Sequence, residues 1–221
     1  MQLTKPIMLL IVGSALAVGV VRLTFLSVSS SKAVAGCPAN LSQEGIDPTQ
    51  TVAFWQNQPI APQTTLAQTI SEKDRQVLGS STGGDKWIEI DLSDQKIIAH
   101  QGSEIFLESP ISSGLFGKTR IGEYAIWYKI RATKMEGGVR GTGTYYYLPN
   151  VPYTMFFDKD IGIHGTYWHQ NFGRPMSHGC VNAPTPIAEK LFYWADPQVP
   201  DGKWAIRSDA DNPGTRVVVH E

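Results

Sequence analysis

Between residues 86 and 92, apolar and polar residues alternate, and this pattern constrains the fold more than any other feature of the sequence. Isoleucine and leucine are interleaved there with Glu89 and Asp91. A period of two is typical of a β-strand that buries one face and exposes the other. The polar residues 93–95 predict a turn, and residues 96–99 predict the second strand of a hairpin.

Further short segments with β-branched and aromatic residues follow, separated by turns that contain glycine or proline. The strands that we expect lie at 105–107, 123–130, 145–148, 154–157 and 216–219. One segment has helical spacing instead, because Ile187, Leu191 and Trp194 recur every three to four residues after Pro186. Many short strands with one or two short helices predict a mostly β fold, either a β-sandwich or a barrel-like sheet.

The N-terminus has the character of a targeting or anchoring segment. Lys5 precedes an uncharged stretch at residues 7–21, which is shorter than the roughly 20 residues that a spanning helix needs. Three interpretations of segment 1–35 remain open: an uncleaved membrane anchor, a signal peptide cleaved after residues 33–35, or a lipoprotein signal that ends at Cys37. Each exports the rest of the chain, so we expect an extracytoplasmic location in the cell envelope, either membrane-anchored or secreted.

Residues 36–85 are polar and rich in glutamine, threonine, serine and proline. This composition predicts a stalk or linker that precedes a folded domain at 86–221. Residues 66–78 fit a helical spacing only in part. The alternative is a helix that packs on the folded domain, which the neighbouring aromatic residues Phe54 and Trp55 favour.

The composition is that of an ordinary globular protein, with 42% hydrophobic residues, 18% charged residues and a net charge of −1 over 221 residues. No basic run indicates a nucleic-acid partner. The two cysteines, Cys37 and Cys180, are too few for a disulfide framework. We expect no disulfide, because a bond between them would consume the only cysteine of the folded domain.

That cysteine lies in a glycine-rich motif with two histidines. Thirteen residues after the histidine of His164-Gly165, the chain continues with Ser177-His178-Gly179-Cys180-Val181-Asn182. A cysteine reacts as its thiolate, and since a free thiol has a pKa of about 8.5, it needs a basic partner near neutral pH. His164 and His178 are the candidates. Gly179 permits a tight turn and leaves room for a substrate at the sulfur.

The motif resembles the signature of the L,D-transpeptidase (YkuD) family, bacterial enzymes that remodel cell-wall peptidoglycan. The resemblance extends over about residues 86–220, where the hairpin at 87–99 looks like the one that opens such domains. Residues 110–114 resemble the family's strand and glycine turn. There are two departures from the family pattern: residues 119–122 lack a proline that members often carry, and the motif ends in Asn182, where many members have arginine.

The resemblance implies that Cys180 is the nucleophile of an acyl transfer and that His164 is its general base and acid. The backbone of Gly165 would orient the imidazole. By the same resemblance, the substrates are peptidoglycan stem peptides, whose third-position diamino acids the enzyme would cross-link without a cofactor. Carbapenem-type inhibitors are then expected to acylate Cys180.

Neighbouring residues supply candidates for the remaining tasks of such a site. The backbone N–H groups of Gly179 and Cys180 would stabilise an oxyanion, with Ser177 and His178 in support. The candidate substrate-binding side chains are, in chain order, Tyr146, Tyr153, Trp168, Arg174 and Asn182. The histidines and the cysteine between residues 164 and 180 match no common zinc spacing, so we expect no metal.

The sequence therefore predicts an exported cysteine L,D-transpeptidase, an acyltransferase. Two alternatives remain. An L,D-carboxypeptidase on the same scaffold would pass the acyl group to water instead of an amine. A non-catalytic wall-binding module would use the aromatic residues at 167–172 as its surface, but it gives no reason for His164 and Cys180 to occur together.

Overall fold

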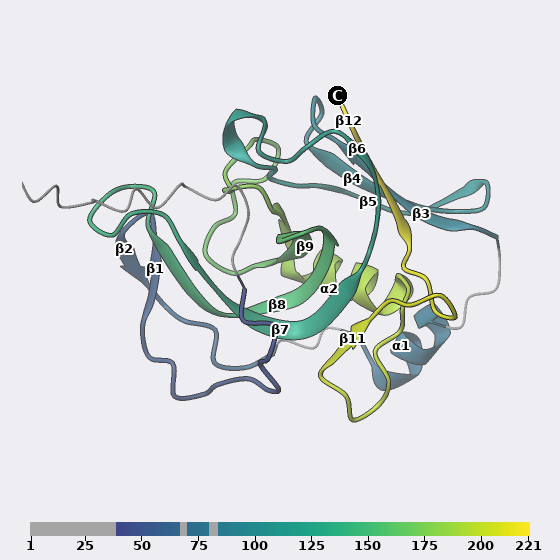
Figure 1. Ribbon diagram of the computed structural model, residues 1–221, viewed down its shortest axis with the longest axis horizontal. Helices are drawn as coiled ribbons and strands as arrows, with labels where there is room; N and C mark the ends of the chain where they lie inside the picture. Colours follow the sequence, from purple (N-terminus) through teal and green to yellow (C-terminus); the bar gives the residue numbers. More distant parts are fainter. Residues whose placement is uncertain (1–38, 67–69, 80–83) are drawn as a thin grey trace, which may run out of the picture. The chain divides into compact units, whose positions relative to one another are not determined.

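The computed structural model describes residues 39–66, 70–79 and 84–221. Within these ranges the chain forms two β-sheets, two short α-helices and one short 3-10 helix (Figure 1). This confirms the expectation of a mostly β fold with short helices. The expected signal or anchor at 1–35 lies outside the described residues, and no helix within them is long and apolar enough to cross a membrane.

The first sheet has five strands in the order β5-β4-β3-β12-β6. Its strands are β3 (Lys86–Asp91), β4 (Lys96–Gln101), β5 (Glu104–Pro110), β6 (Gly122–Ala125) and β12 (Arg216–His220). The C-terminal strand β12 lies between β3, to which it is parallel, and β6, to which it is antiparallel. The alternation predicted for β3 is confirmed, because Ile88 and Ile90 are buried while Glu89 and Asp91 are partly exposed.

The second sheet has seven strands with β8 at its centre. Its strands are β1 (Ala53–Trp55), β2 (Gln58–Ile60), β7 (Tyr128–Gly137), β8 (Tyr146–Asp158), β9 (Ile161–Thr166), β10 (Val181–Pro184) and β11 (Ala205–Arg207). Strand β7 runs along one edge of β8, while β1 and β9 share the other edge at its two ends. Strand β10 adds to β9 in parallel, and β11 adds to β7.

Strand β8 is longer than expected, because the segments predicted at 145–148 and 154–157 join in one strand of 13 residues. Two prolines in the interval lack an N–H donor, and Asn150 and Tyr153 have positive φ angles of 54° and 56°. The pairing of β8 with β7 continues through this irregularity with a register shift. Figure 1 shows both strands as strongly curved.

The strand expected at 123–130 is divided between the two sheets. Residues 122–125 form β6 of the first sheet, and the chain enters β7 of the second sheet at Tyr128. Ile126, between them, is completely buried. This segment therefore crosses the core from one sheet to the other, which alternation alone does not reveal.

Two apolar clusters lie on opposite faces of the seven-stranded sheet. Met155 and Phe157 of β8 belong to a cluster shared with the first sheet, whereas Phe156 between them belongs to a second cluster. Successive residues of a strand point to opposite faces. The first cluster is the main core, and the second, which includes Cys180, covers the other face.

The predicted helix is confirmed as α2 (Thr185–Trp194), with Pro186 in its first turn. It packs into the main core. Lys129 of β7 is completely buried and donates from Nζ to the carbonyl oxygens of Phe192 and Ala195 at the end of α2, both at 2.5 Å. Burial lowers the pKa of Lys129 to about 7. A cation at a helix C-terminus offsets part of its desolvation cost.

The described part of segment 36–85 is not a separate stalk. Strand β1 pairs with the N-terminal end of β8, with Trp55 opposite Tyr146. Helix α1 (Glu72–Gly79) packs on α2, where Arg75 lies 4.8 Å from the ring centroid of Tyr193. Strand β1 and helix α1 thus both contact elements of the 86–221 segment. The physical reason is that β8 extends beyond β9, so its free edge needs a hydrogen-bonding partner.

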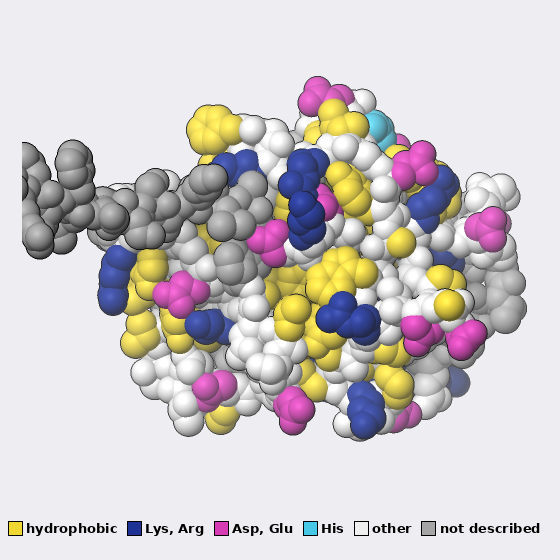
Figure 2. Space-filling view, in the orientation of Figure 1, with side chains coloured by type: hydrophobic (Ala, Val, Ile, Leu, Met, Phe, Trp, Pro, Cys, Tyr) yellow, Lys and Arg dark blue, Asp and Glu magenta, His cyan; other side chains and the backbone are white. Residues whose placement is uncertain are grey.

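The surface carries both signs of charge. Figure 2 shows basic and acidic side chains interspersed over one face, with hydrophobic side chains exposed between them. The net charge of −1 agrees with this distribution. Electrostatic attraction of a strongly charged polymer would need a larger field of one sign.

Candidate active site

The parallel pairing of β9 with β10 brings the two halves of the motif together. In this register His164 lies opposite Asn182, and Ile163 lies opposite Val181. Paired residues point to the same face of a sheet, and successive residues alternate. Ile163 and Val181 belong to the main core, so His164 and Asn182 point to the other face. Cys180, two residues before Asn182, belongs to the cluster on that face.

Cys180 is completely buried beside the turn between β8 and β9. Its Sγ lies 3.7 Å from the carbonyl oxygen of Asp160. The sulfur is in a disulfide in this structure, contrary to the expectation of no disulfide. That expectation assumed that a nucleophilic cysteine stays reduced, which the sequence does not determine. Cys37, the other cysteine of the chain, lies outside the described residues.

His164 is buried, with 1% of its surface exposed. Its Nδ1 lies 3.2 Å from the carbonyl oxygen of Gly165, and because a carbonyl only accepts, Nδ1 carries the ring proton. This tautomer leaves Nε2 as the proton acceptor. Burial lowers the pKa of His164 to about 4, so the imidazole is neutral at pH 7.

Two hydroxyl groups fix the backbone around Cys180. Ser177 Oγ accepts from the N–H of Gly179 at 3.0 Å and donates to the carbonyl of Cys180. Thr119 Oγ1 accepts from the N–H of Gly114 and donates to the carbonyl of Gly179, both at 2.7 Å. The N–H of Gly179, one of the two expected oxyanion donors, is therefore already hydrogen-bonded within the loop in this structure.

The cysteine loop passes close to the segment that follows β5. A Cβ atom added to Gly114 would lie 2.8 Å from the Cα of Gly179. Gly179 has a φ angle of 148°, which side-chain-bearing residues rarely adopt. Directly after Gly114, the 3-10 helix η1 (Leu115–Gly117) begins, and Leu115 donates its N–H to the carbonyl of Ser177. Two glycines thus permit the close contact that positions Cys180.

His178 lies beside Tyr146, with ring centroids 4.8 Å apart. Burial lowers the pKa of His178, and the charge of Lys118 lowers it further. Tyr146 is buried in the same cluster as Cys180, and burial raises the pKa of its hydroxyl. His178 and Tyr146 therefore flank the cysteine loop, but no hydrogen bond from His178 to a side chain is recorded within the described residues.

Asn182 is directed at His169. The Asn182 amide lies 2.8 Å from His169 Nε2, while His169 Nδ1 accepts from the N–H of Asn171. The atom of Asn182 that faces Nε2 is the amide nitrogen Nδ2. Burial lowers the pKa of His169 to about 4. This arrangement holds the loop between β9 and β10 and occupies the side chain of Asn182.

The other candidate substrate-binding side chains are dispersed. Trp168 lies at the site, with its ring centroid 5.6 Å from that of His164. Arg174 is exposed on the loop between β9 and β10. Tyr153 lies in the main core against aromatic residues of α2, on the opposite face of the sheet from Cys180. The structure therefore does not bring Tyr153 to the candidate site.

Two residues of the site were not predicted from the sequence. Trp55 of β1 packs against the rings of Trp168 and His169, at 5.9 and 5.8 Å. Its only signal is an aromatic pair in a polar segment. Thr119 belongs to the four residues compared with the family pattern, but a threonine that joins two backbone segments has no distinct sequence signature.

Known proteins are similar to this chain in sequence or in fold. The model of the L,D-transpeptidase catalytic domain, YkuD, matches residues 85–219. An L,D-transpeptidase solved in complex with imipenem has a TM-score of 0.50 at 21% identity, over 62% of this chain and 60% of that one. An L,D-transpeptidase from Mycobacterium smegmatis has a TM-score of 0.50 at 18% identity, over 63% and 60%. A mutant of the Enterococcus faecium L,D-transpeptidase has a TM-score of 0.47 at 28% identity, over 62% and 50%.

No curated protein matches the chain. The matched part of the chain spans 60% of the length of the first two solved structures, and at these identities the likeness concerns the fold. The family model, in contrast, matches more than half of the chain and includes both halves of the cysteine motif. The chain therefore belongs to the L,D-transpeptidase catalytic domain (YkuD) family.

Proposed function

We propose that this protein is a cysteine L,D-transpeptidase that cross-links peptidoglycan stem peptides. The observation that carries the proposal is the pairing of β9 with β10, which assigns Cys180 and His164 to one face of the sheet. A neutral histidine with its Nε2 free to accept a proton is the partner that a thiol nucleophile needs. The family to which the chain belongs supports the same reading.

In the first half-reaction, His164 Nε2 takes the thiol proton and Cys180 attacks the carbonyl of the third residue of a tetrapeptide stem. That residue would be a diamino acid such as meso-diaminopimelate. The C–N bond to the terminal D-alanine breaks, and His164 returns the proton to the leaving amine. The stem is then a thioester on Cys180.

In the second half-reaction, the side-chain amine of another stem attacks the thioester. His164 accepts the proton of the amine, the new amide bond forms and the thiolate leaves. The thioester conserves the energy of the peptide bond, so no nucleotide is needed. The oxyanion of each intermediate needs fixed donors. The N–H of Cys180 is the proposed donor, joined by that of Gly179 if Ser177 releases it.

The first test is acylation of the reduced full chain by imipenem, the ligand of one solved relative. Intact-protein mass spectrometry should show one adduct, located at Cys180. Because the sulfur is in a disulfide in this structure, the adduct should increase after treatment with a reductant. The Cys180→Ala variant should remain folded and form no adduct. An adduct of equal yield in that variant would refute the nucleophile.

Product analysis with purified stem tetrapeptides separates the remaining alternatives. A cross-linked dimer that appears with release of D-alanine supports the transpeptidase. Tripeptide without dimer identifies an L,D-carboxypeptidase, which uses water as the acceptor. Binding of the stem without any reaction, in a reduced protein, identifies a wall-binding module.

We also propose that the reaction needs no metal. Among the residues that the structure describes, no group of three or more histidine, cysteine or carboxylate side chains is placed to hold a metal ion. Acylation by imipenem should therefore be unchanged after dialysis against a chelator. Loss of acylation that zinc restores would contradict this prediction.

The proposed substrate lies in the cell envelope, so we propose an extracytoplasmic location, reached through segment 1–35. Fractionation of cells that express the full chain should recover it with the envelope or the medium. A chain that begins at residue 39 should stay in the cytoplasm. Recovery of both proteins in the cytoplasm would contradict the location.

A further inference from the structure

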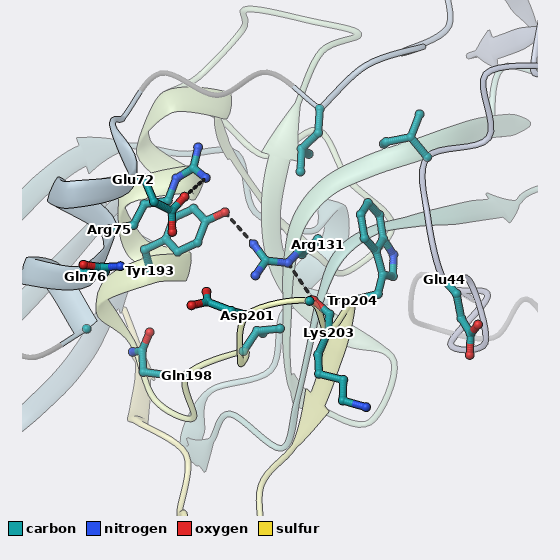
Figure 3. A pocket seen from close by; sticks show the side chains of 15 residues that line it. Glu44, Glu72, Arg75, Gln76, Arg131, Tyr193, Gln198, Asp201, Lys203 and Trp204 are labelled. Atoms are coloured by element: carbon teal, nitrogen blue, oxygen red, sulfur yellow. Dashed lines mark hydrogen bonds and ion pairs between the residues drawn. The ribbon is translucent and has the colours of Figure 1, made fainter.

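A cavity of about 770 Å³ lies between α1 and the loop at 198–204 that leads to β11 (Figure 3). Its volume is within the range of roughly 300–1,000 Å³ that is typical of ligand sites. None of the described residues that line it belongs to the cysteine motif. The proposed reaction therefore does not involve this cavity.

The floor of the cavity is held by hydrogen bonds. Arg131 donates from Nη1 to the hydroxyl of Tyr193 at 2.7 Å and from Nε to the carbonyl of Lys203 at 3.0 Å. Figure 3 shows both bonds, together with the ion pair of Arg75 with Glu72 on the side of α1. The walls are thus fixed to the domain before a ligand arrives, which lowers the entropic cost of binding.

The cavity continues into a smaller one of about 360 Å³. The two share the lining residues Glu44, Gly202, Lys203 and Trp204. The smaller cavity adds Tyr128, whose hydroxyl donates to the carbonyl of Leu41 at 2.8 Å. We call the two cavities together the α1–β11 groove. Two adjoining cavities with the rings of Trp204 and Tyr128 in their lining suit an extended ligand.

Contiguous contacts lead from the groove toward the cysteine. Tyr128 stacks on Trp127, with ring centroids 5.6 Å apart. Trp127 donates from Nε1 to the carbonyl of Lys159 at 3.0 Å. The next residue, Asp160, has its carbonyl beside the Sγ of Cys180. These contacts connect the lining of the groove with the β8–β9 turn beside Cys180.

The charges of the larger cavity are balanced. Its lining includes three basic and three acidic side chains: Arg75, Arg131, Lys203, Glu44, Glu72 and Asp201. Such a lining does not attract a polyanion. The lining offers many hydrogen-bond donors and acceptors, which suit a ligand of low net charge. The hydroxyl and acetamido groups of sugars both donate and accept hydrogen bonds, so a sugar is such a ligand.

We propose that the α1–β11 groove binds a polysaccharide strand of N-acetylated hexoses. Aromatic rings pack against the C–H faces of sugar rings, and the polar side chains match their hydroxyl and amide groups. This inference rests on the proposed function, because the strand would be the glycan that carries the stem peptides. The groove would hold the polymer while one of its peptides reaches Cys180.

The groove is a feature of this chain beyond the matched family domain. Glu44, Ile46, Leu66 and the lining residues of α1 all precede residue 85, where the family match begins. These segments form one wall of the larger cavity, while the domain itself contributes the floor. The site exists only because the described part of segment 36–85 packs on the domain.

The test is a calorimetric titration of the full chain with the tetramer of β-1,4-linked N-acetylglucosamine. The double variant Asp201→Ala/Lys203→Ala changes two exposed side chains of the groove and should bind at least about tenfold more weakly, a loss of one decade in Kd. Trp204→Leu, which removes the ring, should also weaken binding. The matched control Asp94→Ala/Lys96→Ala removes an acid–base pair of the β3–β4 turn and should bind like the wild type.

A wild-type chain that does not bind the saccharide, or groove variants that bind it as the wild type does, would overturn the proposal. Saturable binding of the free stem tetrapeptide in the groove, abolished by the same variants, would also overturn it. Acylation by imipenem is measured in parallel. If the wild-type chain binds the saccharide but is not acylated, the proposed function alone is rejected. If it is acylated but does not bind the saccharide, only the proposal that the groove binds a polysaccharide is rejected.

A second readout uses substrates of two sizes. The Asp201→Ala/Lys203→Ala variant should react with the free tetrapeptide at the wild-type rate and with glycan-linked stems more slowly. Equal rates of variant and wild type on both substrates would show that the groove has no part in binding the polymer.

Discussion

His164 and His178 both have a lowered pKa, but they have different neighbours. The backbone carbonyl of Gly165 fixes the tautomer of His164, whose partner strand leads directly to Cys180. His178 packs against the ring of Tyr146 and is partly exposed. A general base must be both neutral and oriented, and the structure shows both properties for His164.

We therefore expect His164→Ala to slow acylation of Cys180 by roughly 10² to 10⁴-fold, the usual contribution of a positioned base. His178→Ala should cost much less, because it removes a packing contact. The measurement is single-turnover acylation by imipenem under reducing conditions, after circular dichroism has shown that both variants fold. An equal or larger loss in His178→Ala would reverse the two roles.

The buried histidines also predict a dependence of stability on pH. Burial lowers the pKa of His164 and His169 from 6.5 to about 4. The unfolded chain binds these protons near pH 6.5, so the stabilisation is complete above that pH and is lost as the pH falls toward 4. The urea midpoint should fall between pH 7 and pH 5, and it should fall less in His169→Gln. An identical fall in both proteins would argue against this origin.

Cys180 and His164 could be proposed as a catalytic pair from sequence because a motif fixes their spacing. The position of Tyr153 could not be predicted, since it depends on backbone irregularities. Alternation along β8 is interrupted near Asn150 and Tyr153, which have positive φ angles. Each extra residue moves the following side chains to the other face of a strand. Tyr146 consequently faces the cysteine, while Tyr153 points into the main core.

At the scale of elements, the site depends on how three segments meet. The hydroxyl of Thr119 links the turn after β5 to the loop before β10. Both backbone groups that it bonds are buried. A buried amide or carbonyl without a partner is costly, so this side chain supports the local structure as well as the position of Cys180.

Thr119→Val, which keeps the shape and removes the hydroxyl, should lower the free energy of unfolding by at least about 1–3 kcal/mol. It should also slow acylation, because the carbonyl of Gly179 is released. Thr119→Ser retains the hydroxyl and is the matched control. Urea denaturation and imipenem acylation of the three proteins provide the comparison, and a valine variant that matches the wild type in both would contradict this role.

The elements that the sequence predicted are those with a periodic signal of their own. Strand β3 alternates over six residues, and α2 repeats its apolar residues over ten. Strands β1 and β2 have three residues each, too few for a period to be recognised. Strand β1 pairs with the edge of β8, and β2 pairs with β1. Both strands therefore depend on tertiary contacts that their own residues do not indicate, which is why the sequence alone predicts a stalk here.

At the scale of the whole molecule, the folded unit is larger than the family domain. The family match begins at residue 85, whereas β1 completes the edge of β8 and places Trp55 against Trp168. A domain cut at the start of the match would expose that edge to solvent and to other chains. The described N-terminal segments therefore belong to the unit that should be expressed.

We expect a fragment of residues 85–221 to have a lower melting temperature than one of residues 39–221 and to aggregate more readily. The longer fragment keeps β1, β2 and α1, and it is the matched control. Differential scanning fluorimetry and light scattering of both fragments make the comparison. Equal melting temperatures and equal scattering would show that pairing of the β8 edge with β1 contributes neither to stability nor to solubility.

The place of β12 has a consequence for how the protein is made. Strand β12 follows the other described strands in the sequence and lies between β3 and β6, not at an edge of its sheet. During synthesis β3 and β6 have no common partner until β12 emerges, so the first sheet cannot close before then. A nascent chain that cannot complete its fold stays unfolded, and an unfolded chain can pass through a narrow transport channel. The late synthesis of β12 is thus compatible with the proposed export.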